Sequence, residues 1–78
     1  MTISADQSRA ARELLGMSQE ALANFSRVSR TTIVAFENRQ KLPRYNTVNA
    51  IRRALEAAGV EFIAENGGGA GVRLRKAK

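Results

Sequence analysis

Small and apolar residues recur at helical spacing along the first quarter of the chain, from residue 5 to residue 15. Ser4, followed three residues later by Gln7, forms a capping box that begins this helix. Gly16 ends it, because glycine takes the left-handed backbone conformation of a helix C-terminus without strain. The pattern therefore predicts a helix over residues 5–15.

Two short apolar segments follow, and each begins after a serine that can cap a helix, Ser18 and Ser29. They predict helices over 19–25 and 30–37, joined by a tight turn at Ser26–Val28. The residues expected to face the core are Ala21, Leu22 and Phe25 in the first helix and Ile33 and Phe36 in the second.

A polar, basic loop over residues 38–44 holds the single proline, Pro43, and leads into a longer helical pattern. This pattern predicts a helix over 45–58 that ends at Gly59. Its expected buried stripe is Val48, Ile51, Ala54, Leu55 and Ala58.

After Gly59 the apolar period changes from that of a helix to that of a strand. Alternating residues on both sides of a glycine-rich stretch predict a β-hairpin, with 60–65 paired to 71–76. We expect the face formed by Val60, Phe62, Val72 and Leu74 to pack on helices 45–58 and 5–15. The predicted fold is mainly α: a compact four-helix helix-turn-helix domain over 1–59, with a C-terminal β-hairpin and basic tail over 60–78 in the same unit.

The composition excludes several classes of functional site. The 78 residues contain neither cysteine nor histidine, which excludes a zinc finger, a Cys or His nucleophile and a histidine proton shuttle. The acidic residues are scattered, so we expect no enzyme, metal or cofactor. No apolar run is long enough to span a bilayer and no signal-peptide pattern is present, which predicts a cytoplasmic protein without a membrane contact. The net charge of +6 favours a polyanionic partner.

Two short helices joined by a three-residue turn are the geometry that places the second helix in the major groove of DNA. The second helix begins with the polar residues Ser29–Thr32, at the end that meets base edges. The basic residues Arg39, Lys41 and Arg44 follow it, where phosphates are expected. The alternative for each of these residues is an ordinary solvated surface position.

The segments Ser18–Ala23, Val28–Ile33 and Phe36–Arg39, with their spacing to Pro43, resemble the lambda-repressor-like family, also called the xenobiotic response element type. The resemblance covers about residues 8–58. It implies that Gln19 contacts a phosphate and supports the recognition helix, and that Asn38 helps to hold the backbone. It also implies that Arg30, Thr31 and Val34 face the groove and that Arg12 and Glu37 form an internal ion pair.

Two positions depart from the family pattern. Arg27 occupies the turn position that glycine usually holds, at a cost of about 1 kcal/mol in a left-handed conformation. Apolar Val34 and Ala35 replace polar readers, which predicts contact with thymine methyl groups. The full set predicted to contact DNA is Gln19, Arg27, Ser29, Arg30, Thr31, Thr32, Val34, Asn38, Arg39, Lys41 and Arg44.

A two-stranded hairpin has free edges, and a core this small gains from a partner subunit. We therefore expect the hairpin to help form a homodimer, with Leu14, Phe62, Ile63, Val72 and Leu74 at the interface. One alternative is a hairpin that only caps its own monomer. Another is a basic arm that reaches DNA through Arg73, Arg75, Lys76 and Lys78.

These features predict a bacterial or phage transcriptional regulator that acts as a repressor. We expect it to bind double-stranded DNA at a palindromic operator as a dimer, and to associate with the nucleoid through this DNA binding. Half-sites about one helical turn apart are expected. Two alternatives remain open. One is an antitoxin that represses its own operon and holds a toxin or another regulator through the hairpin. The other is a protein-interaction adaptor without DNA binding, against which the basic Arg30 and the 39–44 loop argue.

Overall fold

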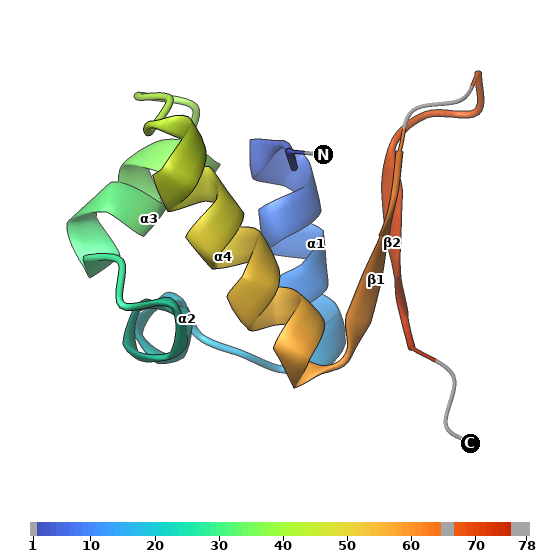
Figure 1. Cartoon of the computed structure of the whole chain (residues 1–78), viewed down its shortest axis with the longest axis horizontal. Coiled ribbons are helices and arrows are strands. Elements are labelled where there is room, and N and C mark those ends of the chain that lie inside the picture. Colours follow the sequence, from blue (N-terminus) through green and yellow to red (C-terminus); the bar gives the residue numbers. More distant parts are fainter. Residues whose placement is uncertain (1, 65–66, 76–78) are drawn as a thin grey trace.

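Four helices are followed by an antiparallel hairpin in the computed structural model, which describes residues 2–64 and 67–75. The helices are α1 (Ala5–Leu15), α2 (Gln19–Ser26), α3 (Arg30–Glu37) and α4 (Tyr45–Ala58), and the strands are β1 (Val60–Ile63) and β2 (Gly71–Leu74). Figure 1 shows the hairpin along the outer side of α1, at the end of the molecule opposite α3. The predicted mainly α domain with a C-terminal hairpin is confirmed.

Serine caps define where the first three helices begin, as the sequence predicts. Ser4, Ser18 and Ser29 each accept a hydrogen bond from the backbone N–H three residues later, at 3.0–3.1 Å. Gly16 ends α1 with a φ of 64°. Helix α2 runs one residue further than predicted because the Ser26 hydroxyl donates to the Leu22 carbonyl oxygen at 2.7 Å and continues the last turn.

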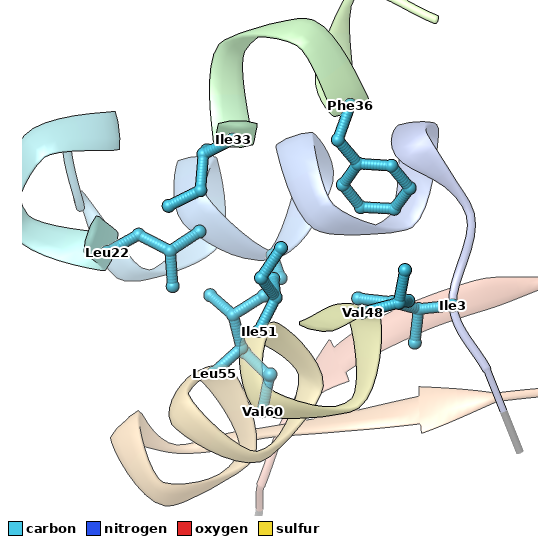
Figure 2. Packing of buried hydrophobic residues seen from close by; sticks show 9 residues of the cluster. Ile3, Leu22, Ile33, Phe36, Val48, Ile51, Leu55 and Val60 are labelled. Carbon is cyan, nitrogen blue, oxygen red and sulfur yellow. The ribbon is translucent and has the colours of Figure 1, made fainter. Parts of the chain in front are cut away.

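The core is formed where the four helices and β1 meet (Figure 2). Ile33 and Phe36 point from α3 toward α1 and α4, and Leu22 enters from α2. The buried apolar residues are Ile3, Ala11, Leu22, Ile33, Phe36, Val48, Ile51, Leu55 and Val60. Both inward residues of α3 are fixed in this core, so its remaining side is free to face outward.

Three residues predicted to pack in the interior are exposed. Phe25 is 66% exposed because the short helix α2 buries only the side that carries Leu22. Ala58 is exposed at the end of α4, where the chain turns away at Gly59. Leu74 is 52% exposed because β2 packs on α1, whereas only β1 also packs on α4.

The hairpin register pairs Val60 with Leu74 and Ile63 with Gly71. The strands were predicted over 60–65 and 71–76 and are shorter: Ala64 and Arg75 lie beyond β1 and β2, and Glu65 and Lys76 lie outside the described residues. The side chain of Gln7, 6% exposed, joins the hairpin to α1: its Nε2 donates to the carbonyl oxygens of Ile63 at 3.2 Å and Gly71 at 2.9 Å.

Candidate nucleic-acid interface

A buried carboxylate, that of Glu37, fixes the position of α3 relative to α1 and α2. Its oxygens accept hydrogen bonds from Ser8 Oγ at 2.6 Å, from Arg12 Nη2 at 2.6 Å and from Gln19 Nε2 at 3.1 Å. Arg9 adds a bond from Nη2 to the Glu37 carbonyl oxygen at 2.8 Å. The ion pair expected between Arg12 and Glu37 is therefore part of a larger network that holds the end of α3.

Burial by itself raises the pKa of the Glu37 carboxyl, because it disfavours the charged form. The hydrogen bonds from Arg12, Ser8 and Gln19, together with the Arg12 charge, outweigh burial and lower this pKa below its ordinary value. Glu37 is therefore ionised at neutral pH, and its negative charge balances the positive charge of Arg12. The amide of Gln19 is committed to this network, so it supports α3 from the side of α2.

The turn between α2 and α3 has Arg27 in the left-handed conformation, with a φ of 61°. The Ser26 hydroxyl accepts a hydrogen bond from the Val28 N–H at 3.2 Å, which supports this turn. Ser29 then caps α3, and its hydroxyl donates to Thr32 Oγ1 at 2.8 Å. The two hydroxyls at the start of α3 thus bond to each other, while Arg27 is exposed beside them.

The outer side of α3 presents a row of side chains that the core leaves free. Arg30 and Thr31 are exposed, and Val34 is half-buried. These three line a shallow depression together with Ala35 and Gln40. Gln40 was missed in the sequence analysis, where it was one polar loop residue among several; only the fold brings it beside the exposed side of α3.

A groove separates the start of α3 from the start of α4, and it carries positive charge. Its lining includes Arg27, Ser29 and Thr31 on one side and Lys41, Arg44 and Thr47 on the other. No described side chain caps α4, so its first N–H groups are directed outward at the end of the helix. Cations and a helix N-terminus in one groove form a site suited to phosphate groups.

Two of the residues predicted to contact DNA do not line this groove. Arg39, in a left-handed conformation with a φ of 60°, forms an ion pair with Asp6 of α1 and does not line the groove. Its pairing follows from the left-handed turn, which directs the chain back toward α1. Asn38 is exposed at the end of α3, where its backbone N–H donates to the Val34 carbonyl oxygen at 2.9 Å.

Replacing Arg27 with glycine should separate stability from binding. Glycine adopts the left-handed conformation without strain, so Arg27→Gly should stabilise the fold by about 1 kcal/mol and raise Tm by roughly 4–8 °C. Its affinity for DNA should fall because a cation leaves the groove. Thermal unfolding and DNA titration measure the two effects. Arg39→Gly is the matched control: it makes the same backbone change outside the groove, so its DNA affinity should be unchanged. If Arg27→Gly bound DNA as tightly as the natural chain, Arg27 would lie away from the phosphates.

Four of the residues predicted at a dimer interface lie in the hairpin, at one end of the molecule, and the fifth, Leu14, lies in α1, which packs on β2. Leu14 of α1 is 45% exposed and Leu74 is 52% exposed, while Phe62, Ile63 and Val72 are half-buried. This end is remote from α3 (Figure 1).

Within residues 2–64 and 67–75, no helix combines the length and apolarity needed to cross a membrane. The same residues contain no cluster of three or more side chains able to ligate a metal.

Comparison with known proteins supports the interpretation of this geometry. Curated protein sequences yielded no match to the chain. A helix-turn-helix family model matches residues 9–62. The match includes most of α1, all of α2, α3 and α4, and most of β1; only the first turn of α1 is missing from the helices. The matched region holds Glu37 with its partners Arg12 and Gln19, the Arg27 turn and the exposed side of α3. The chain therefore belongs to the lambda-repressor-like helix-turn-helix family, a family of DNA-binding regulators.

Proposed function

We propose that this protein is a transcriptional regulator that binds a specific double-stranded DNA sequence with α3 in the major groove. The observation that carries the proposal is the position of the exposed row Arg30, Thr31 and Val34 beside a groove that contains Arg27, Lys41 and Arg44. Bases are read along the row, and phosphates lie in the groove. An α-helix with its side chains is about 10–12 Å in diameter, which suits the major groove, roughly 12 Å wide.

The exposed row supports a division of roles among its side chains. A cation at the N-terminus of a helix is opposed by the helix dipole, so Arg30 gains its favourable partner from outside, at guanine O6 and N7. Thr31 offers a hydroxyl to a neighbouring base or phosphate. Val34 contacts a thymine methyl group. Ser29 and Thr32 hold the start of α3, and Gln40 adds an amide at the edge of the same depression.

The operator is proposed to be a palindrome bound by two copies of the chain, with repression as the outcome. Selection from a random duplex pool, followed by footprinting, tests the proposal. We expect a recovered motif with two inverted half-sites protected on one side of the duplex. Binding to all duplexes with equal affinity, or no binding at low salt, would refute sequence-specific recognition, and the second result would favour a protein-interaction adaptor.

Replacing Arg30 with alanine should relax the preference at one base position of each half-site. The loss of a bidentate contact to guanine should cost about 1–3 kcal/mol on the selected sequence and much less on a sequence altered at that position. Titration of both duplexes measures the difference. Arg53→Ala, which removes an exposed cation of α4 far from the groove, is the control. A uniform loss on every sequence would make Arg30 a phosphate ligand.

A further inference from the structure

Among the described residues, no third strand lies along the outer edge of β2. The described sheet contains only β1 and β2, and β2 is covered by β1 on one side and by α1 on one face. The Arg75 N–H donates to the Gly59 carbonyl oxygen at 2.7 Å. Hydrogen-bonded pairs alternate along an antiparallel ladder, so Arg73 and Gly71 bond to β1 whereas the N–H and C=O groups of Val72 and Leu74 point away from it.

This open edge is already rigid and is bordered by apolar side chains. Buried Gln7 bonds to both strands, so little chain entropy remains to be lost when the edge binds a partner. Leu74 at the end of β2 is 52% exposed, and Leu14 of the adjacent α1 is 45% exposed. The unpaired backbone groups of an open strand edge can pair with a strand of another chain, and the exposed leucines beside it can be buried in the same contact.

We propose that a second copy of this chain binds along the open edge of β2, forming a continuous four-stranded antiparallel sheet with Val72 on the two-fold axis. Two copies of one edge strand are self-complementary about such an axis. Helix α3 lies at the opposite end of each copy, so it stays free (Figure 1). This inference rests on the proposed function only for the assignment of one copy to each half-site.

Charge selects the register. An axis at Arg73 would place two guanidinium groups directly opposite each other, which is unfavourable in a cross-strand pair. An axis at Val72 instead places each Arg73 opposite Gly71 of the second copy and leaves its ion pair with Glu61, at 2.9 Å, intact. Phe62 lies opposite Val72 within each hairpin. The Val72 axis therefore lines up Phe62, Val72, Val72 and Phe62 across the sheet, on the face toward α1.

Single cysteines test this register, because the natural chain contains none. In Val72→Cys the two Cα atoms should lie about 5.5 Å apart, within disulfide range. In the matched variant Gly71→Cys, which keeps Arg73 and its ion pair, they should be about 8 Å apart, too far to bridge. We expect mild oxidation to yield a covalent dimer at least about tenfold faster from Val72→Cys. Faster cross-linking of Gly71→Cys than of Val72→Cys, or no cross-linking of either variant, would overturn the proposed pairing.

The oligomeric state provides an independent test that does not depend on a cysteine in the half-buried position 72. Sedimentation equilibrium at tens of micromolar should show a dimer for the natural chain. Leu74→Lys places a charge at the open edge and should weaken dimerisation by about tenfold or more. Leu42→Lys, which adds the same charge at a residue that is 80% exposed in the 38–44 loop, should leave the dimer intact. A monomeric natural chain, with and without DNA, would overturn the proposal and leave the edge to a different protein.

Duplexes with one and two half-sites separate this inference from the proposed function. On a single half-site, Leu74→Lys should bind as well as the natural chain, whereas on two half-sites it should lose about tenfold in affinity. A dimer that binds no duplex would refute the proposed function and leave the dimer standing. A monomer that still selects one half-site would refute the dimer alone.

Discussion

Replacing Glu37 with alanine should lower the free energy of unfolding by about 3–5 kcal/mol, as much as the loss of a large core side chain. The carboxylate is 1% exposed and accepts bonds from Ser8, Arg12 and Gln19. Its removal leaves the Arg12 charge, with a side chain 15% exposed, without a counterion. A domain of this size is stable by about 4–12 kcal/mol, so the substitution should remove roughly a quarter or more of the free energy of unfolding.

Urea and thermal unfolding measure this loss. Each kcal/mol corresponds to roughly 4–8 °C in Tm for a small domain, so a decrease of more than about 12 °C is expected. Glu13→Ala, which removes an exposed carboxylate of α1, should change Tm by only a degree or two. Similar Tm values for the two variants would show that the Glu37 network contributes no more than a surface charge.

The same carboxylate should make stability depend on pH in the acid range. The pKa of Glu37 is lower in the folded state than in the unfolded chain, so the unfolded chain binds the proton more readily. The contribution of Glu37 to stability is therefore complete above the pKa of the unfolded chain, about 4.3. It is lost as the pH falls through the lower pKa of the folded state. Unfolding curves between pH 7 and pH 3 should show this loss in the natural chain and a smaller one in Glu37→Gln.

Reversing two charges in the groove, with Lys41→Glu and Arg44→Glu together, should reduce DNA affinity by on the order of 100-fold at about 0.1 M salt. Each phosphate contact contributes about 0.9 to the salt slope and hence nearly a factor of ten at that concentration. The slope should therefore fall by roughly two. Lys41→Ala alone should lower it by about one without changing sequence preference.

Arg53→Glu is the control for this double variant, because Arg53 lies on the same helix about 13 Å from Arg44 along the axis. It should change affinity by less than about threefold. An unchanged salt slope in the double variant would place the groove away from the DNA. Thermal unfolding of both proteins should show similar Tm values, since Lys41, Arg44 and Arg53 are all exposed.

Much of the architecture follows from local features of the sequence. The three serine caps and Gly16 set the helix boundaries, because each satisfies backbone groups within three or four residues in the chain. Apolar periodicity predicted the core, because residues at helical spacing share one face of a helix: Ile33, Phe36, Val48, Ile51 and Leu55 are all buried. Arg27 as the left-handed residue of the turn was also predictable, since the family resemblance marks that position as one for glycine.

Other outcomes depended on which element covers which face. The helical pattern alone could not distinguish Phe25, which is exposed, from Leu22 one turn before it, because the exposure of each depends on where α3 and α4 lie. Leu74 is half-exposed because β2 packs on α1 alone. Ile3 is buried although it precedes the first helix, because the chain entering α1 runs along one side of the core and its side chain packs into it (Figure 2).

The sequence by itself therefore determined the helix-turn-helix at 18–38, its polar leading end and the hairpin, because these depend on short-range hydrogen bonds and apolar periodicity. Only the tertiary structure decided how distant residues combine. It brought Arg27 to the same groove as Lys41 and Arg44, and it paired Arg39 with Asp6 instead. It also gave Gln7, whose Oε1 still caps α1, a second role: its Nε2 links α1 to the hairpin. Such contacts join residues far apart in the chain, and their geometry exists only once the core has packed.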